Sequence, residues 1–260
     1  MERSLWKEAF SLDRPPRFPC PFCFWELRGR LQPDRASLRI DDPVRAREFR
    51  ERSGGLAIFE FMRPRFQLTL RCEDPLCGEA VAVAGTVAPW EAEVGGRVTK
   101  RVLCYEEALY PAFFRRAPPI IDLPDTQGGV TALLVEKSFA LFWIDLEACA
   151  NCLRRSIEAI LDDCGAPSRI EKGGRLMPFS WRVQWFARQS EPIVASKVAE
   201  SFKRLADLGH MGSHFGREVT RDSILDAYEL LEVCERDLYG DHEARIDQLK
   251  QRIAEATGKP

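Results

Sequence analysis

The stretch FQLTLRCEDPLC, residues 66–77, joins the pattern of a β-strand to a pair of cysteines. Its first seven residues alternate apolar and polar side chains, which is typical of a strand with one buried face. Cys72 ends this strand, and Cys77 follows in the next turn. An earlier pair, Cys20 and Cys23, lies in the sequence CPFC. The stretch therefore predicts a sheet whose edge carries half of a metal site.

The two cysteine pairs are typical of a structural zinc site. A CPxC turn directs backbone N–H groups at the sulfurs while both thiolates converge on one ion, and Zn²⁺ favours four such soft ligands. We therefore predict that Zn²⁺ binds Cys20, Cys23, Cys72 and Cys77, with unrelated buried cysteines as the alternative. Four protein ligands leave no open coordination position, so this zinc is expected to be structural and not catalytic. The 48 residues between the pairs are long for a minimal zinc ribbon and predict an insertion.

Two further strands are predicted in AVAVAGTV (residues 80–87) and RVTKRVLCY (residues 97–105). Prolines at 118 and 119 and glycines at 128 and 129 then interrupt the chain, and the apolar period becomes helical. We predict an α+β protein with two domains. A β-rich, zinc-ribbon-like module spans residues 1–118, and an α-helical bundle spans residues 119–260.

Helices are predicted within residues 130–163, from about 191 to 209, and from 221 to 239, where Thr220 is a good N-cap. Cys149 and Cys152 fall inside the first helical pattern, so we interpret them as packing residues.

Composition bounds the class of protein. No stretch approaches the roughly 20 apolar residues of a membrane span, and the start, MERSLWKEAF, lacks the apolar core of a signal peptide. We expect a cytoplasmic protein with no membrane partner. Residues 1–71 contain 15 Lys or Arg against 10 Asp or Glu, a charge of +5 in a chain whose total is −2. Such an asymmetry can mark a phosphate-facing module. A genome rich in arginine codons is the simpler explanation, because a +5 excess is modest beside the basic footprint of a dedicated nucleic-acid domain.

Four segments of the second half resemble a known family in order and spacing. They are YPAFFRRAPPIIDLP (residues 110–124), CLRRSIEAIL (152–161), LGHMGSH (208–214) and a long helix ending in DLY (237–239). These resemble the bacterial domain of unknown function numbered forty-one forty-five (DUF4145), which is placed among the HEPN-like helical domains and often follows a small zinc-binding segment. HEPN proteins include metal-independent endoribonucleases of toxin and antiphage systems, usually dimers with a shared active site.

The resemblance also implies candidate catalytic residues. His214 takes the place of the family histidine, His210 stands where asparagine is usual, and Gly209 replaces the arginine that precedes it in active nucleases. Imidazoles are the usual acid and base near pH 7. Arg204, with five residues between it and His210, fits the family spacing of arginine and histidine and would bind phosphate. Arg236 lies at the same spacing before a third histidine and fits equally well.

Substrate-binding candidates come from the same comparison. Arg155 and Glu158 match an R-x-x-E motif of the family on the preceding helix, and Arg217 can supply a further cation. For Arg155 and Glu158, an ion pair between helices is the alternative.

Two functions follow from these observations. The first is a zinc-stabilised, HEPN-like component of a bacterial defence or toxin system that binds or cleaves RNA. If it is an enzyme, it is a metal-independent endoribonuclease. The second is a non-catalytic module that dimerises, or binds a partner protein of a defence system, through its helical domain. No nucleotide-binding glycine motif lies at a strand–helix junction, and no G-x-S-x-G element is present, which argues against those enzyme classes.

Overall fold

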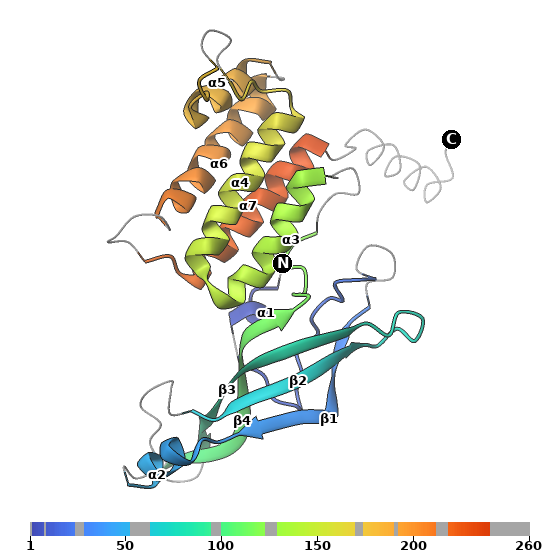
Figure 1. Cartoon of the computed structure of the whole chain (residues 1–260), viewed down its shortest axis with the longest axis vertical. Coiled ribbons are helices and arrows are strands. Elements are labelled where there is room, and N and C mark those ends of the chain that lie inside the picture. The colour runs from blue at the N-terminus through green and yellow to red at the C-terminus, as the bar shows by residue number, and fades with distance from the viewer. Residues whose placement is uncertain are drawn as a thin grey trace, which may run out of the picture.

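The computed structural model of the chain is α+β, as the sequence predicts. Among the described residues, a four-stranded antiparallel sheet is followed by a region of five helices. Figure 1 shows the helices stacked above the sheet, with the short helix α1 (Ser4–Lys7) between them. The structure describes residues 2–7, 9–23, 29–52, 63–94, 100–122, 129–169, 174–189, 192–211 and 218–239.

The sheet has the strand order β1-β2-β3-β4, and each strand is antiparallel to its neighbour. The strands are β1 (Leu31–Asp41), β2 (Arg65–Cys72), β3 (Ala80–Val94) and β4 (Lys100–Arg115). The helix α2 (Val44–Arg52) follows β1. The segment between the cysteine pairs, predicted as an insertion, therefore contains the first strand of the sheet itself.

The two faces of the sheet differ in polarity because side chains alternate along a strand. In β2, Phe66, Leu68 and Leu70 are buried on one face, while Arg65 and Gln67 are exposed on the other. The buried face packs against aromatic side chains of the N-terminal segment, including Phe10, whose ring centroid lies 6.4 Å from that of Phe66. We call the opposite side the outer face.

Five helices form the second region, and their caps follow from the sequence. They are α3 (Gly129–Ile144), α4 (Leu146–Asp163), α5 (Phe179–Gln189), α6 (Pro192–Met211) and α7 (Arg221–Tyr239). Asp145 caps α4 by accepting a hydrogen bond from the Ala148 N–H at 2.9 Å, and Thr220 caps α7 through the Ser223 N–H at 3.2 Å. The predicted cap of α7 is therefore confirmed.

Polar groups contact one another among the apolar side chains in the interior of the helical region. Tyr228 in α7 is fully buried, and its hydroxyl lies 2.7 Å from the Ser138 hydroxyl and 3.4 Å from the Cys149 sulfur. Cys152 is also buried, and its sulfur faces the Leu134 carbonyl at 3.2 Å. Both cysteines are packing residues, as predicted.

The sheet and the helices share one hydrophobic core. Trp143, near the end of α3, is 6% exposed and lies with its ring centroid 4.6 Å from that of Phe114 in β4. The centroids of Phe18 and Trp6 lie 6.1 and 6.2 Å from it. This aromatic cluster joins the two regions, because its members come from both.

Two features of the strands differ from the sequence prediction. β1 was not predicted, and β4 runs on to Arg115, so the residues YPAFFR, grouped above with the helical resemblance, form the end of the last strand. The predicted boundary at residues 118 and 119 falls between β4 and α3. None of the described helices is long and apolar enough to cross a lipid bilayer.

Candidate functional site

The four predicted zinc ligands lie together at one edge of the sheet. Cys20 and Cys23 come from the turn before β1, whereas Cys72 ends β2 and Cys77 lies in the turn to β3. A backbone hydrogen bond closes each turn: the Cys20 N–H donates to the Gly29 carbonyl at 2.9 Å, and the Cys72 N–H donates to the Glu79 carbonyl at 2.9 Å. The sheet register therefore positions all four thiols.

The arrangement of the sulfurs fits a tetrahedral metal ion. All four sulfur atoms lie within 4.8 Å of one another, with 3.8 Å between Cys20 and Cys77 and 3.5 Å between Cys23 and Cys72. A tetrahedral site with metal–sulfur bonds of about 2.3 Å places its sulfurs roughly 3.8 Å apart. The Phe22 N–H also points at the Cys20 sulfur at 3.4 Å, as the CPxC motif predicts. The four cysteines can therefore bind a metal.

Burial and a bound metal ion act in opposite directions on the charge of these sulfurs. Burial raises the pKa of the Cys20 and Cys72 thiols, because charge is unfavourable away from water. A bound divalent ion reverses this effect, since the thiolate and not the thiol is the ligand. An ion bound by all four sulfurs would have no open coordination position and would join the two turns.

Gly29 fits the metal site through its lack of a side chain. A Cβ atom at this position would lie 2.6 Å from the Cys72 sulfur and 2.7 Å from the Cys23 sulfur. Both distances are far shorter than ordinary van der Waals contact, which lies near 3.5–4.0 Å for carbon. The backbone of Gly29 therefore forms one wall of the sulfur cluster.

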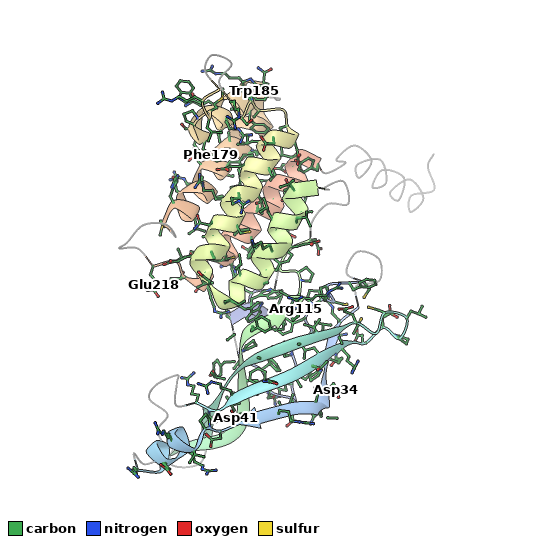
Figure 2. All side chains as sticks on the ribbon, viewed as in Figure 1. Asp34, Asp41, Arg115, Phe179, Trp185 and Glu218 are labelled. Carbon is green, nitrogen blue, oxygen red and sulfur yellow. The ribbon has the colours of Figure 1, made fainter. Side chains whose placement is uncertain are left out.

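The outer face of the sheet combines arginines with small side chains. By register, Thr69 of β2 pairs with Ala82 of β3, and Ala82 with Arg115 of β4. In the next row Arg39 of β1 pairs with Gln67, which pairs with Ala84 and so with Phe113. Figure 2 shows Arg115 on the end of β4 nearest the helical region.

An exposed aromatic ring lies on this outer face. Phe113 is 41% exposed, and it lines a groove of about 440 Å³ together with Arg39, Arg65, Ala84 and Asp41. The small side chain of Ala84 beside Phe113 leaves the ring open to a flat ligand. The outer face is therefore a candidate binding surface.

The arginines of the outer face differ in their partners. Arg71 pairs with Asp34 at 3.1 Å, so its charge is offset within the sheet. Arg39 donates only to the carbonyls of Ala36 and Leu38, at 2.9 and 2.7 Å. Together with Arg65 and Arg115, it forms no ion pair with any residue that the structure describes. Charge for binding an anion therefore remains on this face.

The histidine segment is described only in part. His210 is exposed in the last turn of α6, whereas His214 and Arg217 lie outside the described residues. Arg204 is exposed on the same helix and pairs with Glu200 at 3.1 Å. His210 lies six positions after Arg204, which corresponds to about 9 Å along the helix axis. The directions of the two side chains around the axis differ by about a third of a turn. The two side chains therefore do not project from one face of α6.

A different arginine approaches the end of α6. A Cβ atom at Gly209 would lie 2.6 Å from the Cβ of Arg154 in α4, so glycine permits the close contact of these helices. Arg154 donates to Glu158 at 2.9 Å, one turn along α4. Glu158 thus pairs within its own helix, and the predicted Arg155 is exposed. Arg154 is therefore the arginine whose side chain contacts Gly209, the residue before His210.

Comparison with family models divides the chain in the same place as its fold. Residues 8–114, which contain the four cysteines and the sheet, match a domain of unknown function (DUF8608). Residues 136–256 match another domain of unknown function (DUF4145). The chain therefore has matches to two families of unknown function, each over less than half of its length. The DUF4145 match supports the resemblance found in the sequence, although it begins at residue 136 and not at residue 110. Comparison with curated proteins and with solved structures found no match.

Several residues of the outer face of the sheet were not predicted as site residues from the sequence. Phe113 and Arg115 were assigned to the helical resemblance, and the strand that contains Arg39 was not predicted. For Phe113 and Arg115 the signal was the series of aromatic residues that continues past the predicted strand, at positions 105, 110, 113 and 114. In the region that matches DUF4145, the sequence motif predicts Arg155 as the site residue, whereas Arg154 contacts α6. The sequence does not fix which of these two arginines faces α6.

Proposed function

We propose that this protein binds single-stranded nucleic acid, RNA in the first instance, on the outer face of its sheet. The observation that carries the proposal is the exposed ring of Phe113 in a groove with Arg39 and Arg65. Proteins that hold single strands combine a positively charged groove with aromatic rings on which bases stack. A base stacked on Phe113 would cover apolar surface that the fold leaves in water, while the arginines contact the flanking phosphates.

The chemistry of this face predicts the form of the ligand. A duplex hides the faces of its bases, so a stacking platform favours unpaired strands. Stacking is worth about 1–3 kcal/mol per base and tolerates any base, so we expect little sequence preference. Each arginine that neutralises a phosphate adds about −0.7 to the dependence of log K on log salt for a single strand.

We further propose that the metal is zinc and that its role is structural. The support is the donor set, since four thiolates in tetrahedral arrangement are a preferred environment of Zn²⁺. Cys72 would hold the end of β2 and Cys20 the turn before β1. Zinc would thereby fix the register of the strands that carry Arg39 and Arg65, without taking part in any reaction.

Cleavage of RNA by the DUF4145 region is a second candidate. The observation that favours it is the close contact of the Arg154 side chain with Gly209, the residue before His210. A HEPN-like mechanism would use His210 and His214 as acid and base and Arg154 in place of the missing family arginine. A role in a bacterial defence system would follow from the same resemblance. The test is incubation of a mixed RNA pool with the protein and a chelator, using His210→Ala and Arg154→Lys as variants.

The binding proposal is tested by fluorescence anisotropy with a labelled oligouridine of about 10 nucleotides. Phe113→Leu keeps an apolar side chain but removes the ring, and we expect it to weaken binding roughly 5- to 150-fold. Arg65→Gln should weaken binding and reduce the salt dependence. Trp181→Ala is the matched control, because Trp181 is 56% exposed on α5, away from the sheet.

The outcomes separate the candidate functions. Equal affinity of wild type and Phe113→Leu, with both folded, would contradict the assignment of the outer face. Absence of binding to any single strand, with four cysteines metallated, would favour the non-catalytic protein-interaction module instead.

A further inference from the structure

A second pocket, of about 440 Å³, lies where the sheet region meets the helical region. Its walls come from both: Tyr110 and Pro111 of β4 on one side, and Trp143 at the end of α3 with Arg221 at the start of α7 on the other. Three of its lining residues are cationic, namely Lys7, Arg63 and Arg221. None of the described residues that line it is acidic.

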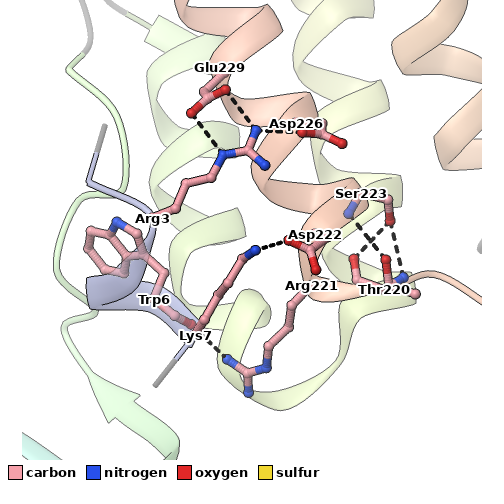
Figure 3. Close-up of polar contacts among 9 residues, drawn as sticks. All are labelled: Arg3, Trp6, Lys7, Thr220, Arg221, Asp222, Ser223, Asp226 and Glu229. Carbon is pink, nitrogen blue, oxygen red and sulfur yellow. Dashed lines mark hydrogen bonds and ion pairs between the residues drawn. The ribbon is translucent and has the colours of Figure 1, made fainter. Parts of the chain in front are cut away.

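Arg221 is held at this pocket without a carboxylate. Its guanidinium lies over the rings of Phe142 and Trp143, with 5.1 and 5.2 Å to the ring centroids. Among the described residues, its guanidinium donates one hydrogen bond, to the Trp6 carbonyl at 3.4 Å (Figure 3). The stacking fixes the orientation of the guanidinium and leaves most of its N–H groups available.

Arg3, a neighbouring arginine at this junction, has carboxylate partners that Arg221 lacks within the described part of the chain. Arg3 pairs with Glu229 at 2.7 Å and also with Asp226, so two carboxylates of α7 satisfy its charge. Arg221 lies on α7, as these two carboxylates do, and is half-buried. Burial lowers the pKa of its guanidinium, and no acidic group among the described residues raises that pKa. A half-buried guanidinium without an acidic partner gains stability when it binds an anion from outside the chain.

Arg63 is placed in a similar way on the opposite wall. Its guanidinium lies over the Tyr110 ring at 5.6 Å, and its Nε is buried without a hydrogen-bond partner among the described residues. Lys7 contributes less, because it forms an ion pair with Asp222, which offsets its charge. Two positive charges, from Arg63 and Arg221, therefore remain at the pocket.

We propose that this junction pocket binds a phosphate monoester of nucleotide size, with Arg63 and Arg221 as its phosphate ligands. Guanidinium groups bind phosphate oxygens in bidentate fashion, and two of them match a dianion. The volume exceeds that of inorganic phosphate and lies in the range of small-molecule sites, so a sugar or base can enter with the phosphate. The Tyr110 ring, which is 40% exposed, offers aromatic surface to such a group.

The position of the pocket allows two sources for the same chemistry. Thr86 and Ala112 line both this pocket and the groove on the outer face. A free nucleoside monophosphate would occupy the pocket alone, whereas the 5′-phosphate of a strand would enter from the groove. In either case the ligand contacts residues of both regions and so stabilises the contact between them. The pocket does not depend on the strand-binding proposal, because its cations are distinct from Arg39, Arg65 and Arg115.

The test is a titration of the metallated full chain with inorganic phosphate, with uridine monophosphate and with uridine. Binding is followed by tryptophan fluorescence, since Trp6 and Trp143 line the pocket, and by the melting temperature. We expect saturable binding of the monophosphate, weaker binding of phosphate and none of uridine. Arg63→Gln and Arg221→Gln should each weaken monophosphate binding at least 10-fold, and Arg188→Gln, on exposed α5, should not.

Two variants keep the test decisive if one of them unfolds. Unchanged affinity in a folded Arg63→Gln or a folded Arg221→Gln overturns the proposal, and so does the absence of saturable binding by wild type. Comparison of 5′-phosphorylated and 5′-hydroxyl oligouridine then identifies the source. A preference for the 5′-phosphate that disappears in Arg63→Gln indicates a strand end, and no preference indicates a free nucleotide. Phe113→Leu should leave monophosphate binding intact, so failure of either proposal is visible separately.

Discussion

Replacement of Gly29 by alanine should disrupt the metal site without touching a ligand. The added Cβ would lie 2.6 Å from the Cys72 sulfur and 2.7 Å from the Cys23 sulfur. Ordinary contact near 3.5–4.0 Å leaves a deficit of about 1 Å toward each sulfur. Metal–sulfur bonds tolerate only about 0.2 Å of displacement, so the tetrahedron cannot absorb the methyl group. Either one sulfur leaves the metal or the backbone of the turn moves.

The magnitude follows from these alternatives. Overpacking of a well-packed site costs about 1–3 kcal/mol, which is equivalent to roughly a 5- to 150-fold loss of metal affinity. We expect Gly29→Ala to fall in this range when zinc is titrated against a chromophoric chelator. When cobalt replaces zinc, the absorption band of tetrahedral thiolate coordination should be weaker in Gly29→Ala than in wild type.

Gly78→Ala is the matched control for Gly29→Ala. Gly78 lies one residue after Cys77 with a φ of +60°, and a Cβ there would meet nothing within 4 Å. It should lose about 1 kcal/mol of folding stability from backbone strain but retain its metal affinity. If Gly29→Ala binds zinc as tightly as Gly78→Ala does, the sulfurs do not close around one ion in the way we describe.

Three further predictions concern the junction and the helical region. Trp143→Ala should lower the free energy of unfolding in urea by about 3–5 kcal/mol, because the ring packs between both regions. Gly209→Ala should cost about 1–3 kcal/mol, since its Cβ meets that of Arg154, and introducing the family arginine there should be at least as costly. The hydrogen bond from Arg3 lowers the pKa of Glu229. The pair therefore stabilises the fold above the ordinary Glu pKa of 4.5 and loses this effect as pH falls through the lower folded pKa. Acid titration of the melting temperature should accordingly show a smaller drop for Arg3→Gln than for wild type.

Each of these has a result that would count against it. Trp181→Ala, on an exposed site, should change the unfolding free energy by less than about 0.5 kcal/mol, and a similar loss in both tryptophan variants would deny a special role to the junction. A Gly209→Ala protein as stable as wild type would show that α4 and α6 do not approach so closely. Parallel acid curves for Arg3→Gln and wild type would exclude a contribution from the Arg3–Glu229 pair.

The cysteine cluster and the helices α3, α4, α6 and α7 could be predicted from the sequence because their signals are local, whereas α5 was not predicted. Two cysteine pairs define a site almost regardless of what lies between them, and the N-cap Thr220 marks the start of α7. Strand β1 was missed because it is an edge strand whose pairing shifts between Asp34 and Arg39, and this interruption removes the two-residue period.

Residues of the candidate binding surface could not be predicted for a different reason. The outer face depends on which residues of four strands stand side by side, and this register is a property of the whole sheet. In α4, Arg154 and Arg155 differ by about 100° in direction, so only packing decides which one approaches Gly209. The pocket between Arg63 and Arg221 likewise forms only when the two regions are placed together.

Photo-crosslinking tests the assignment of the outer face most directly. Single-stranded RNA containing 4-thiouridine would be irradiated with the metallated protein, and the attached peptides would be identified by mass spectrometry. We predict cross-links to the segment of β4 around Phe113 and to β2 around Arg65, and their loss in Phe113→Leu. Cross-links confined to the helical region, at His210 or elsewhere in α6, would contradict the account.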